Sequence, residues 1–155
     1  MKTTAILSLL ALTAPILAAC AGSAVGAGPA RPADGNDCAV IAAVAKEHYR
    51  FGPDNVPPPL WLDGRGGDWR PACDWSRYGL SFPETYDPDA PVQRDENGRP
   101  RIRWVSFKPP RYDGEGALVE AGIMHGPLAG MGVECRVRSG VAGWTVQQCR
   151  NTWIS

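Results

Sequence analysis

Hydrophobic and polar residues alternate along the C-terminal half of the chain, which is the pattern of β-strands that bury one face. In residues 132–138, Val133, Cys135 and Val137 share one face, and charged side chains occupy the positions between them. The same alternation predicts strands at residues 101–107, 117–125 and 144–149, and residues 151–155 extend the last of these. Residues 139–143 are predicted to form the turn between the last two strands.

A helical spacing precedes the strands. Apolar or amphipathic residues recur at positions 40, 41, 44, 45 and 48, which places them on one side of a helix. Asn36 or Asp37 can cap this helix, and it is expected to end before Gly52. Strands that share an apolar face can pack on a single helix. The predicted fold class is therefore α+β, with one N-terminal helix packed on a small antiparallel sheet and disulfides that staple the domain.

Turn signals fill the middle of the chain. Residues 53–100 contain three consecutive prolines and several Asp-Gly, Gly-Gly and Asn-Gly pairs, so a long irregular region is predicted. Trp61, Trp69 and Trp75 lie in its first half and indicate that this half is packed.

The N-terminus reads as a targeting signal. Lys2 precedes an apolar run, residues 5–19, that is too short to span a bilayer. The run ends in Leu17-Ala18-Ala19-Cys20, which resembles the lipobox of bacterial lipoproteins. The resemblance implies cleavage before Cys20, acylation of that cysteine and, because Ala21 follows, anchoring in the outer membrane facing the periplasm.

Three segments follow from this interpretation. Residues 1–19 are the signal peptide, residues 20–35 are the lipidated cysteine with a Gly- and Pro-containing flexible tether, and residues 36–155 are one globular domain. The whole chain has 16 basic and 16 acidic residues, so no net charge draws it to nucleic acid. Its hydrophobic fraction of 44% excludes a solvated disordered chain.

Four further cysteines, Cys38, Cys73, Cys135 and Cys149, are an even number, which favours disulfides in an oxidising compartment. Three connectivities are possible. The pairing of Cys38 with Cys73 and of Cys135 with Cys149 is favoured, because it joins the helix to the Trp-rich loop and closes the last hairpin. No Cys or His spacing fits zinc, and neither a metal nor a cofactor is predicted.

The last 30 residues resemble small exported bacterial domains of no established activity. The likeness rests on His125-Gly-Pro-Leu-Ala-Gly-Met-Gly132, on Gly143-Trp144-Thr145-Val146 and on the terminal Thr152-Trp153-Ile154-Ser155. Cysteines often stand in that group where this chain has His125 and Ala129. The glycines at 126, 130 and 132 fit a connection that needs positive φ or a close backbone approach. Trp144 and Trp153 are then core or edge aromatics.

Two interpretations compete for the Trp-rich segment, residues 61–78. Aromatic faces interleaved with carboxylates are typical of a loop that binds sugars or peptides. Alternatively, the tryptophans fill a small core while Arg65, Arg70 and Arg77 pair with Asp63, Asp68 and Asp74. The candidate binding residues are Trp61, Trp69, Trp75, Asp68 and Asp74.

Catalysis is the less favoured function. His125 could act as a general base with Glu120 or Glu134 as the orienting carboxylate, which would make a small periplasmic hydrolase. His125 and Glu120 are five residues apart, however, so a regular strand points them to opposite faces. The sequence therefore predicts a lipid-anchored envelope protein that binds an envelope protein or peptidoglycan.

Overall fold

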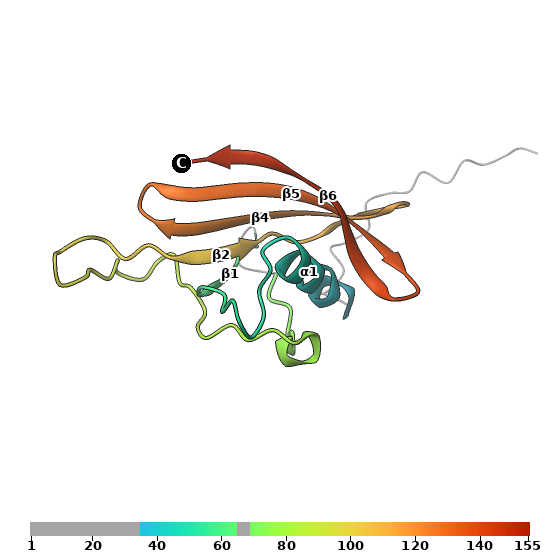
Figure 1. The fold of residues 1–155 in the computed structure, drawn as a ribbon, viewed down its shortest axis with the longest axis horizontal. Coiled ribbons are helices and arrows are strands. Elements are labelled where there is room, and N and C mark those ends of the chain that lie inside the picture. The colour runs from blue at the N-terminus through green and yellow to red at the C-terminus, as the bar shows by residue number, and fades with distance from the viewer. Residues whose placement is uncertain (1–34, 65–68) are drawn as a thin grey trace, which may run out of the picture.

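The computed structural model describes residues 35–64 and 69–155 and contains one α-helix and a six-stranded sheet (Figure 1). The elements are α1 (Gly35–Glu47), β1 (Leu60–Leu62), the 3₁₀ helix η2 (Trp75–Tyr78), β2 (Trp104–Phe107), β3 (Arg111–Asp113), β4 (Gly116–Gly126), β5 (Ala129–Gly140) and β6 (Gly143–Ile154). The fold class is α+β, as predicted, although the sheet dominates.

The sheet is mixed and not purely antiparallel. Its order is β1-β2-β4-β5-β6, and β3 pairs with the start of β4. The pairs from β2 to β6 are antiparallel, whereas β1 runs parallel to β2 with Leu60 opposite Val105. The prediction of an antiparallel sheet was wrong at this edge, because the long connection between β1 and β2 lets the chain return in the same direction.

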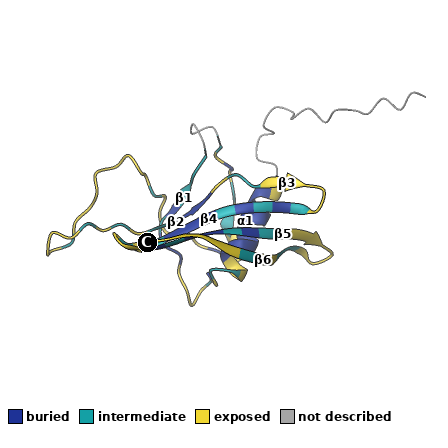
Figure 2. Cartoon of the chain, turned by 90° about the horizontal axis from the view of Figure 1, so that it is seen from above, coloured by how far each residue is buried: buried dark blue, intermediate teal, exposed yellow. Residues whose placement is uncertain are grey.

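The core lies between α1 and one face of the sheet. Residues 117, 119, 121 and 123 of β4 point toward the helix, and Val133, Cys135 and Val137 of β5 lie beside them in register. Val105 and Phe107 continue this face on β2 and are fully buried. Seen from above, the sheet lies in front of α1, and the buried positions run along β4 and β5 (Figure 2). The alternation predicted for residues 132–138 is confirmed.

The helix begins at Gly35, one residue before the predicted caps, and ends at Glu47. Asp37 consequently lies inside the first turn and not at the cap. Val40, Ile41 and Val44 are fully buried, as the helical spacing requires. After the helix, Arg50 has a φ of 60°, and the side chain of Asn55 donates hydrogen bonds to the carbonyl oxygens of Tyr49 and Arg50.

Two disulfides cross-link the described residues. Cys38 of α1 bonds Cys73 in the loop before η2, and Cys135 of β5 bonds Cys149 of β6. This is the pairing that the sequence favoured. In the chain-entropy account, a disulfide of this kind stabilises a domain by about 2–4 kcal/mol.

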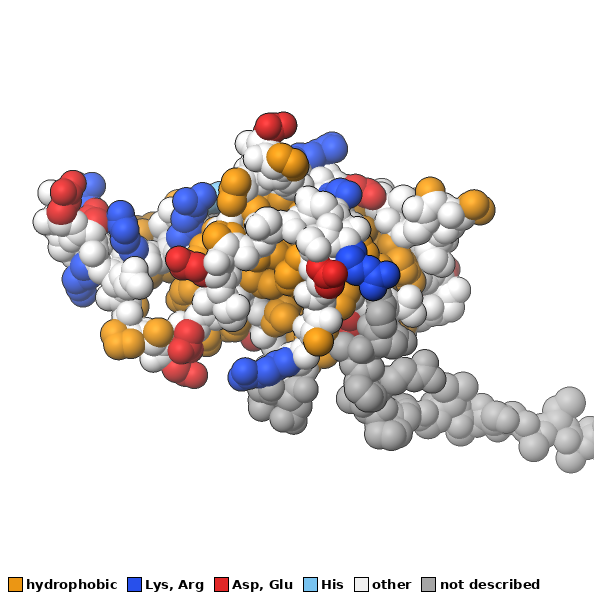
Figure 3. Space-filling model, turned by 90° about the horizontal axis from the view of Figure 1, so that it is seen from below, with side chains coloured by type: hydrophobic (Ala, Val, Ile, Leu, Met, Phe, Trp, Pro, Cys, Tyr) orange, Lys and Arg blue, Asp and Glu red, His pale blue; other side chains and the backbone are white. Residues whose placement is uncertain are grey.

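The middle of the chain is irregular, as predicted. It also contains β1 and η2, which were not predicted because turn-forming residues dominate this region. Pro57, Pro58 and Leu80 are buried and fix this region to the core. Seen from the helix side, hydrophobic side chains are visible in the middle of the molecule, and charged side chains crowd the loop that extends from one end (Figure 3).

Candidate functional site

The face of the sheet opposite α1 is covered by no helix or strand of the described residues (Figure 1). On β4 this outer face carries Glu120, Gly122 and Met124, the residues between the buried positions. Register places Gly132 of β5 opposite Gly122, and Trp153 of β6 opposite Gly132. Because paired residues point to the same side of a sheet, side chains from distant parts of the sequence meet here.

Trp153 lies across a floor of three glycines. A Cβ added at Gly132 would overlap the pyrrole part of its indole, and a Cβ at Gly122 or Gly130 would come within 3.1 Å of its six-membered ring. The ring touches positions on both β4 and β5, so it lies flat on the backbone of the sheet. Trp153 is still 41% exposed. The indole therefore rests on the sheet, while about two-fifths of Trp153 remains accessible to solvent.

Three more aromatic rings continue this surface. Trp104 lies on β2, on the other side of β4 from β5. Its ring would be 3.4 Å from a Cβ added at Gly122. Trp61 packs edge-on against Trp104 with ring centres 5.2 Å apart, and Tyr86 lies 5.9 Å from Trp61 and 6.1 Å from Trp104. We call Trp61, Tyr86, Trp104 and Trp153 the aromatic platform. Each of the first three is half-buried, so the rings are held in place but accessible.

Charged side chains lie on the same face beside the aromatic platform. Glu120 and Glu134 are directly opposite each other on β4 and β5. Arg111 bridges them, with Nη1 2.9 Å from Glu120 and Nη2 2.7 Å from Glu134. Lys108 donates to Glu120 at 2.7 Å, and Arg150 donates to Glu134 through two nitrogens. Glu134 lies two residues from Gly132 along β5, so this network adjoins the floor under Trp153.

The network orients these charged side chains more than it stabilises the fold, because exposed ion pairs typically contribute only about 0–1 kcal/mol to folding stability. The hydrogen bond from Lys108 is the main reason that the pKa of Glu120 lies below its ordinary value. Glu120 is therefore ionised at neutral pH and cannot serve as a general acid, which needs a pKa near the working pH. The arrangement offers positioned hydrogen-bond donors and acceptors next to flat apolar rings.

The structure does not assemble the predicted catalytic group. His125 is exposed near the end of β4, where the pairing with β5 becomes irregular. Within the described residues, no hydrogen bond or ion pair joins it to Glu120 or Glu134, whose carboxylates are bound by Lys108, Arg111 and Arg150.

The predicted binding loop is divided between the two sides of the sheet. Trp61 belongs to the aromatic platform, whereas Trp69 and Trp75 pack against the core on the helix side. Asp74 accepts a hydrogen bond from Ser76, and Asp68 and Arg65 lie outside the described residues. For Trp69 and Trp75, the alternative interpretation as core residues agrees with the structure.

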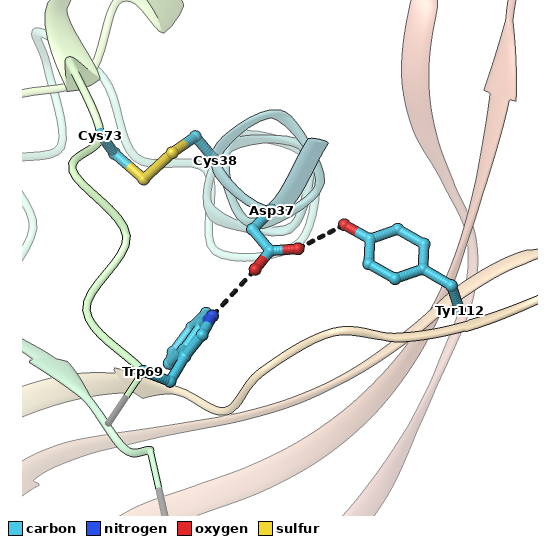
Figure 4. Close-up of a disulfide and its surroundings, with 5 residues drawn as sticks. All are labelled: Asp37, Cys38, Trp69, Cys73 and Tyr112. Carbon is cyan, nitrogen blue, oxygen red and sulfur yellow. Dashed lines mark hydrogen bonds between the residues drawn. A yellow bond between two sulfur atoms is a disulfide. The ribbon is translucent and has the colours of Figure 1, made fainter. Parts of the chain in front are cut away.

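Asp37 explains why Trp69 is held on the helix side (Figure 4). Its buried carboxylate accepts a hydrogen bond of 2.8 Å from the indole of Trp69 and one of 2.6 Å from the hydroxyl of Tyr112. The adjacent Cys38–Cys73 disulfide joins the helix to the same loop. Asp37 thus ties the start of α1 to the loop and to β3.

One cluster that resembles a metal site has a structural explanation. The side chains of His48, Cys135 and Cys149 come within 4.8 Å of one another, a proximity that sequence spacing did not reveal. Both sulfurs form the Cys135–Cys149 disulfide, so they are not thiolate ligands. Burial, followed by the charge of Arg50, lowers the pKa of His48.

Sequence reasoning missed Tyr86, Trp104, Arg111 and Lys108 as site residues and treated Trp153 as a core or edge aromatic. Gly130 and Gly132 were the available signal, since Trp153 makes the close approach expected there, whereas an added Cβ at Gly126 meets nothing closer than 3.9 Å. Neither the family models, nor the curated proteins, nor the solved structures compared with this chain gave a match.

Proposed function

We propose that this chain is a lipid-anchored protein of the bacterial cell envelope that binds glycan strands of the cell wall through the aromatic platform. The observation that carries the proposal is the flat, half-open indole of Trp153 on its glycine floor. Apolar faces of sugar rings stack on such aromatic surfaces, and their hydroxyls need fixed donors and acceptors nearby. Arg111, Glu120 and Glu134 lie in position to supply these.

The two disulfides support the proposed location. Two disulfides fit an oxidising compartment outside the cytoplasm. Within residues 35–64 and 69–155, no helix is long and apolar enough to cross a membrane. Cys20, the proposed lipid attachment site, lies outside the described residues. Replacing it, as Cys20→Ser, should move the protein from the membrane fraction to the soluble fraction, and unchanged fractionation would contradict the anchor.

Co-sedimentation with purified insoluble peptidoglycan tests the binding function. We expect Trp153→Ala to weaken binding at least about tenfold, the equivalent of about 1.4 kcal/mol, because the stacking ring is lost. Trp153→Tyr keeps a ring and should retain part of the affinity. Leu128→Ala is the matched control, since Leu128 is an exposed hydrophobic residue, 86% accessible, in the turn between β4 and β5.

The outcomes separate the possible partners. Full binding by Trp153→Ala would show that the aromatic platform is not the glycan site. If the wild-type chain fails to sediment, but crosslinking in cells captures one envelope protein in a Trp153-dependent manner, the face binds protein and the glycan proposal is wrong.

A further inference from the structure

A second site, separate from the aromatic platform, surrounds the Cys135–Cys149 disulfide. A ring nitrogen of His48 and the two Sγ atoms of this disulfide all lie within 4.8 Å of one another. His48 follows the end of α1, whereas the cysteines belong to β5 and β6, so the fold brings a titratable base to a disulfide. Among the described residues, no histidine or carboxylate forms such a cluster with the other disulfide, Cys38–Cys73.

The two sulfurs of this disulfide differ in their access to solvent. Cys135 is fully buried in the core, whereas Cys149 is half-buried and lines an open groove of about 440 Å³ between the end of α1 and β6. Access is one of the factors that decide which sulfur of a disulfide is attacked. An incoming thiol therefore reaches the sulfur of Cys149, and attack there makes Cys135 the leaving group.

His48 is suited to assist this attack. Burial, followed by the charge of Arg50, lowers the pKa of His48, so most of its imidazole is neutral at pH 7 and can accept a proton. A buried thiolate is unfavourable, because apolar surroundings raise the pKa of a thiol. Cys135 consequently needs a proton when it leaves, and His48 is adjacent to both sulfurs and can carry one.

The groove favours a cysteine within a polypeptide over a small charged thiol. Glu47 and Arg50 line it with opposite charges, and Gln147 and Gln148 add neutral amides, so no net charge selects an anionic or a cationic compound. Its volume lies in the range of about 300–1,000 Å³ that is typical of ligand sites. A cysteine can therefore enter together with parts of its neighbouring residues.

We propose that the Cys135–Cys149 disulfide oxidises pairs of cysteine thiols in polypeptides that enter this groove, with His48 as the proton carrier. The proposal does not depend on glycan binding, because the groove and the aromatic platform share no residue.

The reaction consists of two thiol–disulfide exchanges. In the first, a substrate sulfur attacks Sγ of Cys149 and its proton passes to His48. The bond between Cys149 and Cys135 breaks, and Cys135 keeps the electron pair and takes the proton from His48. In the second, the other substrate thiol attacks the substrate sulfur bonded to Cys149, which leaves and takes up the second proton. The substrate thus loses two electrons and two protons to the protein, and a disulfide of another protein is the oxidant that restores the pair.

The reduced pair stays in place for this reoxidation. β5 and β6 are paired on both sides of Cys135 and Cys149. Val133 and Val137, two residues to either side of Cys135, are buried and hold β5 on the core. The backbone therefore keeps the two thiols opposite each other after the bond has opened.

The test uses the full oxidised chain in detergent and a reduced nine-residue peptide that contains two cysteines. Acid quenching, alkylation of free thiols and peptide mapping show which disulfide has opened and where the peptide is attached. The Cys135–Cys149 disulfide should open at least tenfold faster than Cys38–Cys73, with the peptide trapped on Cys149. Reduced glutathione at the same thiol concentration should act at least tenfold more slowly than the peptide.

Two histidine variants test the proton carrier. His48→Ala enlarges the groove, so a merely shielding role of His48 would raise the rate of opening, whereas loss of the proton carrier should lower it at least tenfold. His125→Ala is the matched control, because it removes the other histidine of the chain, and it should react like the wild type. If His48→Ala does not fold, as judged by its melting temperature, the comparison of the two disulfides in the wild type decides the question.

Four results would overturn the proposal. These are equal rates of opening for the two disulfides, a peptide trapped on Cys135, a rate in His48→Ala that equals or exceeds the wild type, and glutathione that acts as fast as the peptide. The third result would leave His48 with a structural role only, and the fourth would assign the groove to a small thiol.

Discussion

Replacing Gly132 with alanine should displace Trp153 while leaving every residue of the aromatic platform in the sequence. The new methyl group would overlap the indole, which lies near the end of the chain and can move away more easily than the backbone. Because Gly132 has no positive φ, alanine itself is compatible with the strand. The substitution therefore tests the position of the ring and not its presence.

The magnitude follows from the burial of Trp153. The side chain is 41% exposed, so somewhat more than half of its surface is covered. A tryptophan that buries about 150 Å² gains roughly 3–4 kcal/mol at 25 cal/mol per Å², which is an upper bound. Since the displaced ring keeps some contacts, we expect Gly132→Ala to lower the free energy of unfolding by about 1–3 kcal/mol.

Thermal unfolding and peptidoglycan co-sedimentation measure the two consequences. For a domain of this size, each kcal/mol corresponds to roughly 4 °C in Tm. The control is Gly140→Ala on the same strand, where an added Cβ meets nothing closer than 3.8 Å and the stability should change by no more than about 1 kcal/mol. If Gly132→Ala matches Gly140→Ala in both Tm and glycan binding, Trp153 does not rest on the glycine floor and the reasoning fails.

Three other predictions concern groups away from the aromatic platform. Tyr49→Phe should leave stability unchanged or raise it by about 1 kcal/mol in urea unfolding, because the buried Tyr49 hydroxyl has no hydrogen-bond partner among residues 35–64 and 69–155; a loss above about 1 kcal/mol would contradict this. Asp37→Ala should cost about 2–3 kcal/mol in the same assay, since it removes the buried carboxylate that binds both Trp69 and Tyr112, and an unchanged midpoint would refute the role of Asp37. The lowered pKa of His48 predicts a contribution to stability that is complete above pH 6.5 and is lost as the pH falls through the folded-state pKa. The free energy of unfolding should therefore change less between pH 7 and pH 5 in His48→Gln than in the wild type.

Much of the fold follows from local patterns. Strands β4 and β5 are long, and their buried positions alternate with less buried ones often enough to be recognised from sequence. Strand β1 is only three residues long and cannot show such a period, so its parallel pairing with β2 was not foreseen. The prediction of an antiparallel sheet failed for the same reason.

The candidate site was less predictable than the fold. Trp61, Trp69 and Trp75 are close in sequence, but only Trp61 reaches the outer face, because Leu60 and Leu62 turn toward the core. Trp104 and Trp153 come from strands that β4 and β5 separate.

The sequence by itself determined the alternating strands, the helix, the set of cysteines and the need for close approach at Gly130 and Gly132. Local spacing carries this information, since side-chain direction in a strand or helix repeats with a fixed period. Only the tertiary structure decided that Trp153 covers Gly122, Gly130 and Gly132, and that Arg111 joins Glu120 to Glu134. Those contacts depend on strand order and register, which arise from pairing between segments far apart in the chain.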